Sequence, residues 1–327
     1  MKIAVDAAGG DFFPENPVKG AVLAVQEYSD LSVVLTGPEH TIKKELDLHD
    51  HPSGRIFVQD APQIIGMEET PAQAVKNKTN SSIVVGLGMH QKGLVDGFVS
   101  AGNTGALMAA SAFILGRLDG IIRPSIATFF PTVKGPGLMI DAGANLEAKP
   151  EMLFQFGSMG DIYARDIMGI KTPRVGLLNV GEEKEKGSET LKKAHQLLKS
   201  LPNFIGNIEG RDILSGKANV FVCEGVTGNI LLKFGESIPE ALKTLLMGVI
   251  QEKQLEKKQI ALMVSLLEEA FIPFDYQAVG GVPFLGVNGI SMVGHGGSSP
   301  MAIKNMILNA VKMAETDINK KIIASVA

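Results

Sequence analysis

Short apolar runs rich in β-branched residues alternate along the chain with longer stretches in which apolar residues recur at helical spacing. The short runs predict β-strands and the longer stretches predict amphipathic helices. We expect strands at residues 2–6, 32–35, 55–58, 97–100, 125–130, 137–141, 174–179 and 220–223. We expect helices at residues 17–28, 104–118, 150–168, 189–198, 230–250 and 300–318.

This alternation predicts an α/β fold, a mostly parallel sheet with helices on both faces. Asn16 before Pro17 predicts a helix cap followed by the first helical residue. Ser188 is expected to cap the helix at 189–198. The sequence shows no internal repeat and no linker rich in Ser, Thr or Pro. We therefore expect a single α/β domain over residues 1–327. A helical pair at 239–270 is the candidate for an element that protrudes from it.

Five predicted strands end in a glycine-containing turn that also carries small polar or charged side chains. These turns lie at residues 6–11, 100–105, 141–145, 179–183 and 224–229. Ligands bind beyond the carboxyl ends of parallel strands, so we expect the turns to converge on one pocket. Asn103-Thr104 and Thr227-Gly228-Asn229 precede apolar helical runs and are candidate anion cradles. For any single turn, the alternative is an ordinary helix cap that binds no ligand.

Charge and composition exclude several classes of function. The formal net charge is −4 and no long basic block is present, so nucleic acid binding is not expected. One cysteine cannot form an internal disulfide, which fits a reducing compartment. Asp6 interrupts the N-terminal apolar run, which argues against a signal peptide. The apolar stretch at 105–116 is shorter than the roughly 20 residues that span a bilayer. These features predict a cytoplasmic protein that is not integral to a membrane.

Common cofactor and nucleophile signatures are missing. No G-x-G-x-x-G follows a strand, no G-x-S-x-G is present, and the six histidines do not form a zinc pattern. We expect neither a cofactor nor a metal.

The turns resemble, in order along the chain, those of the bacterial acyl-ACP:phosphate acyltransferase (PlsX) family. The resemblance rests on Ile-Ala-Val-Asp-Ala-Ala-Gly-Gly-Asp (3–11), Ser-Ala-Gly-Asn-Thr-Gly-Ala (100–106), Asp-Ala-Gly-Ala-Asn (141–145), Leu-Leu-Asn-Val-Gly (177–181), Glu183, Lys186-Gly187, Thr-Gly-Asn (227–229), Gly280-Gly281 and His295-Gly296. It implies a fold like that of the isocitrate and isopropylmalate dehydrogenases and the phosphotransacetylases, and it also implies a homodimer.

The implied reaction converts a long-chain acyl-[acyl carrier protein] and inorganic phosphate into acyl phosphate and free acyl carrier protein, in phospholipid biosynthesis. A membrane glycerol-3-phosphate acyltransferase is the expected downstream partner. Two alternatives stay open: a short-chain phosphotransacylase using coenzyme A, and a non-catalytic membrane scaffold for lipid synthesis. A decarboxylating dehydrogenase is disfavoured because no metal-binding Asp cluster is evident.

Phosphate is the nucleophile in such a reaction, so the site must hold it and stabilise an oxyanion. We expect the catalytic residues to be Asn103, Lys186, Asn229 and His295. The expected phosphate- and substrate-binding residues are Asp6, Gly9, Gly10, Gly102, Thr104, Asn145, Thr227 and Gly228. Lys186 would neutralise phosphate, and His295 would orient it or move a proton. The alternatives are a solvated lysine, a structural histidine and, for Asp6, turn bonding.

Apolar residues recur at helical spacing within 239–270 on both sides of a charged stretch. An amphipathic helix pair of this kind can lie in a membrane interface. We expect Leu245, Leu246, Val249 and Ile250 to contact a membrane peripherally. The alternative is a face that packs on the core or on a dimer partner.

Overall fold

The computed structural model describes residues 1–253, 256–272, 277 and 280–326. These residues form an 11-stranded sheet with the order β3-β2-β1-β4-β11-β10-β5-β6-β9-β7-β8. The strands are β1 (Lys2–Asp6), β2 (Ser32–Gly37), β3 (Ile56–Asp60), β4 (Gly97–Ser100), β5 (Ser125–Phe130), β6 (Gly137–Ile140), β7 (Val175–Leu178), β8 (Phe204–Ile208), β9 (Val220–Val222), β10 (Val282–Leu285) and β11 (Ser291–Val293).

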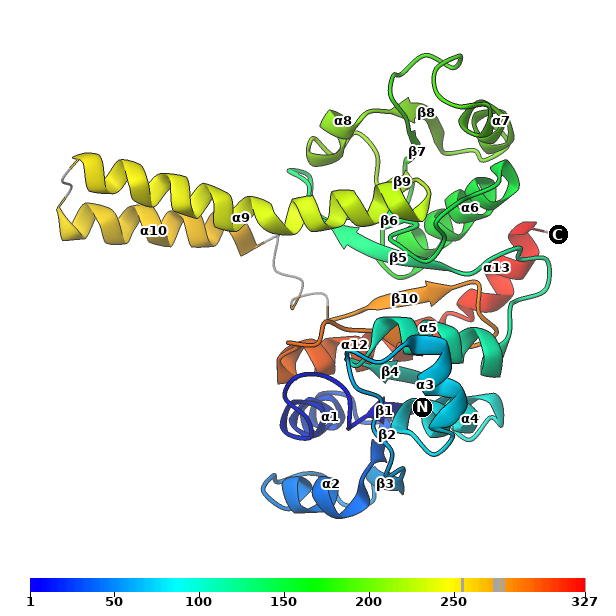
Figure 1. Cartoon of the computed structure of the whole chain (residues 1–327), viewed down its shortest axis with the longest axis vertical. Helices are drawn as coiled ribbons and strands as arrows, with labels where there is room; N and C mark the ends of the chain where they lie inside the picture. The colour runs from blue at the N-terminus through cyan, green and yellow to red at the C-terminus, as the bar shows by residue number, and fades with distance from the viewer. Residues whose placement is uncertain (254–255, 273–276, 278–279, 327) are drawn as a thin grey trace.

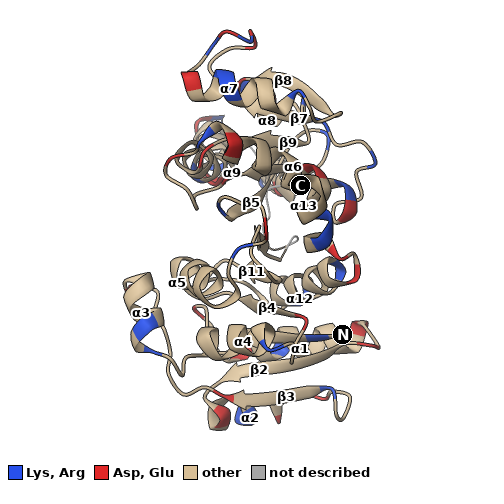
Figure 2. Cartoon of the chain, turned by 90° about the vertical axis from the view of Figure 1, so that its right-hand side faces the viewer, with Lys and Arg blue, Asp and Glu red and all other residues tan. Residues whose placement is uncertain are grey.

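Helices cover both faces of this sheet, as Figure 2 shows for α5 and α12 on opposite sides of β4. The helices are α1 (Glu15–Glu27), α2 (Glu39–Leu46), α3 (Pro71–Asn77), α4 (Ser82–Gln91), α5 (Thr104–Ala110), α6 (Pro150–Asp166), α7 (Glu189–Leu198), α8 (Gly210–Leu214), α9 (Gly225–Lys253), α10 (Lys257–Phe271), α12 (Pro300–Glu315) and α13 (Ile318–Val326). A π-helical turn, Ser111–Leu115, continues α5. The expected α/β fold with a mostly parallel sheet is confirmed.

The strand alternation of β1 shows how the sequence builds the two layers. Ile3 and Val5 point into the core shared with α1 and α12, whereas Ala4 points into the core shared with α4 and α5. Successive side chains of a strand face opposite sides, so a strand buried on both faces is apolar at every position. That is why this part of the chain reads as a continuous apolar run.

The sheet reverses direction in its middle, where β10 runs antiparallel to β11 and β5, and β5 runs antiparallel to β6. The strands β1 to β4 and β11 are parallel to one another, and β6, β9, β7 and β8 form a second parallel set of opposite direction. The five glycine-containing turns therefore do not share one edge of the sheet. The expectation of a single edge was wrong because it assumed a uniform strand direction.

All eight predicted strands are present, with ends shifted by at most two residues. The cap predicted at Asn16 is wrong: α1 begins at Glu15, and the Asn16 amide donates to the Ser298 carbonyl at 2.9 Å. The cap predicted at Ser188 is confirmed, since its hydroxyl accepts from Leu191 N at 3.3 Å. The helix predicted at 300–318 breaks into two at Asp317, whose φ is 51°.

The helices α9 and α10 extend side by side away from the body (Figure 1). We call this pair the arm; the predicted pair at 239–270 lies within it, apart from residues 254–255, which fall outside the described residues. The described helices include none that is both long enough and apolar enough to cross a membrane.

Candidate active site

The turns after β1 and β4 form one hydrogen-bonded unit. Asp6 is buried, and its carboxylate accepts from Ser100 Oγ at 2.6 Å and from Ala8 N at 3.1 Å. Ser100 Oγ in turn accepts from Gly102 N at 2.9 Å. Burial raises the pKa of Asp6, and the bond from Ser100 opposes that rise. Asp6 thus shapes the turn through its hydrogen bonds, and it is almost fully buried.

Glycines bring these turns together with the loop after β11. A Cβ on Gly9 would lie 2.3 Å from the Asp6 carboxylate and 2.9 Å from Gly102 N, so only glycine fits. Gly10 has a φ of 93°, and the next residue donates from its N to Gly296 O at 2.9 Å. Gly9, Gly10 and Gly102 therefore bring the two turns together beside Gly296.

Asn103 caps helix α5 and links it to residues 66–69. Its Oδ1 accepts from Ala106 N at 3.0 Å at the start of α5. Its Nδ2 lies within hydrogen-bonding distance of three carbonyl oxygens, those of Gly66, Met67 and Glu69. The side chain is 6% exposed and its polar atoms are engaged within the protein. Asn103 therefore positions Thr104, the first residue of α5.

Asp141 organises the turn after β6 in the same way. Its carboxylate accepts from Ile126 N, Ala144 N and both nitrogens of Asn145, at 2.7 to 3.2 Å. Burial raises its pKa, and the Asn145 side chain opposes the rise. The Asn145 carbonyl accepts from Gly225 N at 2.9 Å, which links this turn to α9. Asn145 thus holds the turn in place.

The start of α9 differs from the prediction. The helix begins at Gly225, so Thr227, Gly228 and Asn229 lie inside its first turns. The Glu224 carboxylate accepts from the N–H and the hydroxyl of Thr227, which caps the helix at this early point. A Cβ on Gly228 would lie 1.9 Å from the Asp141 carbonyl, so Gly228 permits close packing of the helix on the turn.

A cavity of about 350 Å³ lies between α9, β5 and the carboxyl ends of β4 and β11. We call it the β5 cavity. Thr104, Asn229 and His295 all line it, although they come from three distant stretches of the chain. His295 Nδ1 accepts from Gly297 N at 3.1 Å, which orients the imidazole. Two hydroxyl- or amide-bearing side chains and one imidazole can together bind an anion and donate to an oxyanion.

Lys233 also lines the β5 cavity, one turn beyond Asn229 on α9. Among the described residues that line it, Lys233 is the one with a permanent positive charge. The sequence reasoning missed it because Lys233 lies within a helix and not in a strand-end turn. Its spacing of four residues from Asn229 was the available signal.

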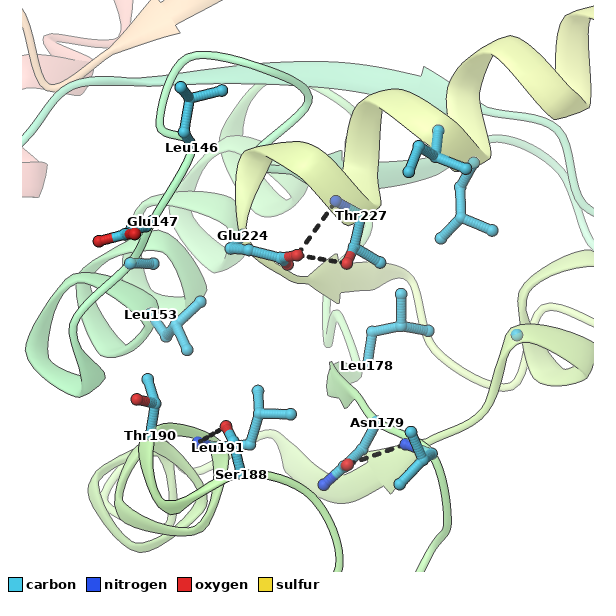
Figure 3. Close-up of a pocket in the computed structure, with 15 residues that line it drawn as sticks. Leu146, Glu147, Leu153, Leu178, Asn179, Ser188, Thr190, Leu191, Glu224 and Thr227 are labelled. Atoms are coloured by element: carbon cyan, nitrogen blue, oxygen red, sulfur yellow. Dashed lines mark hydrogen bonds between the residues drawn. The ribbon is translucent and has the colours of Figure 1, made fainter.

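A second cavity, of about 750 Å³, lies between α9 and α7 (Figure 3). We call it the α7 cavity. Thr227, Glu224 and Asn179 line it, together with leucines that include Leu178 and Leu191. Thr227 therefore lies apart from Thr104, Asn229 and His295, with the helix α9 between the two cavities. Among the described residues, its lining includes two carboxylates and no Lys, Arg or His.

Lys186 is exposed on the loop that precedes α7. Its carbonyl accepts from the Asn179 side chain at 3.0 Å, and its N–H donates to Glu183 O at 3.1 Å. It lines neither cavity. Within this chain the structure thus does not bring Lys186 together with Asn229 and His295.

A protein-family model described as "Fatty acid synthesis protein" matches residues 1–321. The chain belongs to this family. It is 43% identical to the phosphate acyltransferase of Halothermothrix orenii over 326 residues, 99% of this chain and 96% of that protein. It is 47% identical to the phosphate acyltransferase of Salinibacter ruber over 321 residues, 97% and 95% of the two chains. The expectation of an acyltransferase of this family is confirmed.

Solved structures support the expected fold. A phosphotransacetylase from Streptococcus pyogenes matches with a TM-score of 0.65 at 16% identity, covering 97% of this chain and 94% of the other. The EutD phosphotransacetylase from Staphylococcus aureus matches with a TM-score of 0.61 at 15% identity, covering 96% and 94%. At these identities the likeness concerns the fold alone. The family member described here thus shares its fold with phosphotransacetylases, as its motifs led us to expect.

Proposed function

We propose that this acyltransferase moves a long acyl group from acyl carrier protein onto inorganic phosphate. The observation that carries the proposal is the β5 cavity, in which Thr104, Asn229, His295 and Lys233 meet. This set suits a phosphate dianion beside a carbonyl group that becomes an oxyanion. The relatives are named phosphate acyltransferase, which supports the transfer of an acyl group to phosphate.

In the proposed reaction a phosphate oxygen attacks the thioester carbonyl and a carbon–oxygen bond forms. The carbon–sulfur bond then breaks, and the carrier leaves as a thiolate that takes up a proton. A free thiol has a pKa of about 8.5, so the leaving group needs no strong general acid. Electrostatic positioning of phosphate is thus the main demand on the protein.

The cavity residues divide into those that contact substrate and those that position them. We assign phosphate and oxyanion contacts to Thr104, Asn229 and His295, and charge neutralisation to Lys233. The positioning residues, which act through the turns that they shape, are Asp6, Gly9, Gly10, Gly102, Asn103, Asn145 and Gly228.

Residues in or near the α7 cavity have no role in this scheme within one chain. Thr227 and Lys186 would act at the reaction centre only if a second copy of the chain brought them to it. The proposed homodimer is where such a contribution would arise.

We also propose that the arm contacts a membrane peripherally, where a downstream glycerol-3-phosphate acyltransferase would receive the acyl phosphate. Leu245 and Val249 are 66% and 45% exposed on α9, and Leu246 is half-buried. Ile250 is 3% exposed, so we leave it out of the contacting set.

Trapping with hydroxylamine tests the reaction. Palmitoyl-carrier and phosphate should yield acyl hydroxamate with the wild-type chain. Asn229→Ala should lower kcat by about 100-fold, the usual effect of removing one oxyanion donor. Gln73→Ala, which removes an exposed amide on α3, is the matched control and should keep the wild-type rate.

The same assay separates the competing functions. Acetyl-CoA with phosphate as the preferred substrate pair would favour the short-chain phosphotransacylase. No hydroxamate from any acyl donor would favour the scaffold. An unchanged kcat in Asn229→Ala, with palmitoyl-carrier still used, would place the reaction outside the β5 cavity.

A further inference from the structure

The β5 cavity has two regions of different chemistry. Thr104, Asn229 and His295 form its polar end. Farther along α9, apolar side chains join the lining beside the charged Lys233 and Glu236. They are Phe129 and Phe130 from β5 and Leu232 from α9, which we call the apolar wall. A cavity that joins a polar end to an apolar wall suits a molecule with a reactive head and a hydrocarbon tail.

The cavity extends well beyond its polar end. The residues of α9 that line the cavity run from Asn229 to Glu236. Seven residues of helix span about 10 Å at about 1.5 Å per residue. This length accommodates several methylene groups of a chain whose carbonyl lies near Asn229.

A close helix–strand contact sets the width of the cavity. Phe130 is 4% exposed and lies against the buried Gly235 of α9. A Cβ on Gly235 would come within 2.7 Å of two Phe130 ring atoms. Helix α9 therefore packs directly against β5 at Gly235 and Phe130. This contact limits the space of the cavity beside Leu232.

We propose that this apolar wall binds the acyl chain beyond its first few carbons, and that Leu232 limits how it fits. The inference rests on the proposed transfer of an acyl group to phosphate. The chain passes along α9 from Asn229 toward the arm.

The α7 cavity is the competing location, because it is larger and also carries leucines. It lies on the other side of α9 from Asn229, and its lining includes Glu147 and Glu224. A thioester whose chain lay there would be separated from Thr104 and His295 by the helix. Leu231 lines the α7 cavity and Leu232 lines the β5 cavity. Substituting one or the other of these adjacent residues therefore tests which cavity holds the chain.

The test compares Leu232→Trp with the matched variant Leu231→Trp. The kcat/KM values for butyryl-, octanoyl- and palmitoyl-carrier are measured with each protein. Burying one methylene changes binding by about fourfold. Leu232→Trp blocks at least two methylene positions and should lower the palmitoyl-to-butyryl ratio by about tenfold or more. Leu231→Trp should leave that ratio unchanged, and Leu232→Phe should give an intermediate shift.

A binding measurement separates this inference from the proposed reaction. A fluorescent analogue of palmitic acid is titrated into each variant after its Tm shows that it is folded. We expect Leu232→Trp to weaken binding by about tenfold or more, for the same loss of methylene contacts, and Leu231→Trp to leave it unchanged. Equal binding by all variants, or weakening by Leu231→Trp alone, overturns the inference whether or not acyl phosphate is formed. Absence of acyl phosphate despite this binding pattern contradicts the proposed reaction alone.

Discussion

At Lys233 the β5 cavity gains the positive charge that a phosphate dianion needs. Lysine is a compact cation that can approach phosphate from a helix without a fixed fork geometry. The sequence reasoning gave this role to Lys186, which the structure places on an exposed loop at neither cavity. The two assignments therefore predict different results for phosphate affinity: one expects Lys233 to contribute to it and the other expects Lys186 to do so.

Lys233→Met should raise the KM for phosphate by about tenfold, because a charge-assisted hydrogen bond contributes about 1.5–3 kcal/mol. Initial rates at varied phosphate, with palmitoyl-carrier saturating, measure this. Lys19→Met, which removes an exposed lysine of α1, serves as the control. A rise in KM for Lys186→Met but not for Lys233→Met would return the role to Lys186.

Thr104 and Asn229 were singled out from predicted strand ends, and His295 from the family resemblance. All three line the β5 cavity, and their roles there stay predictions. Asn103 caps α5, which is the alternative that the sequence left open for this turn, and its amide also donates to carbonyl oxygens of Gly66 and Met67. No local pattern encodes such contacts.

Among the elements, the arm has the clearest unpaired apolar surface. Phe234, Leu242, Leu245 and Val249 are all exposed on α9, and no residue of α10 is buried. A helix with such a face binds a membrane interface or another protein surface.

Replacing Leu245 and Val249 together by Glu should weaken binding to anionic vesicles by about tenfold or more, since burying each side chain contributes about 1.5–3 kcal/mol. Co-sedimentation with vesicles measures the bound fraction. Leu48→Glu changes an exposed leucine at the end of α2 and should leave binding unchanged. Wild-type chain that stays in the supernatant with anionic and neutral vesicles would contradict membrane contact.

Strands were predictable where an uninterrupted apolar run marks them, even a run as short as β9. The strands β10 and β11 were not predicted, because Pro283 interrupts the first and Gly286 and Gly289 lie between the two. The reversal of the sheet does not arise at β10, which is antiparallel to both neighbours and so leaves β11 and β5 pointing the same way. It arises at β5 and β6, two predicted strands that run antiparallel to each other, and the expectation of one shared sheet edge overlooked that pairing.

On the scale of the whole molecule, His90 joins distant parts of the fold. Its Nε2 accepts from Ile290 N at 2.7 Å, so Nδ1 carries the proton and donates to Val95 O at 2.9 Å. Burial lowers the pKa of His90, and a bond to Val95 and the charge of Asp96 oppose this. The folded state thus requires a neutral imidazole.

Because the folded-state pKa of His90 is below its usual value of about 6.5, the unfolded chain binds a proton more readily. The free energy of unfolding should therefore fall as pH drops below about 6.5, by at most about 1.4 kcal/mol per pH unit for one proton. Urea unfolding of wild type and His90→Gln between pH 7 and 5 measures the difference in slope.

The His90→Gln variant should be less stable at pH 7 but less sensitive to acid. Asp6 and Asp141, whose pKa values burial raises, titrate in both proteins and cancel in the comparison. His40→Gln, at an exposed position of α2, should keep the wild-type slope. Identical slopes for wild type and His90→Gln would show that His90 does not govern the acid response.

The pairing of β11 with β4, and the packing of α12 against α1, have a consequence for the order of events during synthesis. A ribosome has already made β1 to β4 when β11 and α12 are still untranslated. The edge of β4 that pairs with β11 therefore stays unpaired until residues 291–293 are made. The inserted half, from β5 to β9, has all of its own strands much sooner and can fold first.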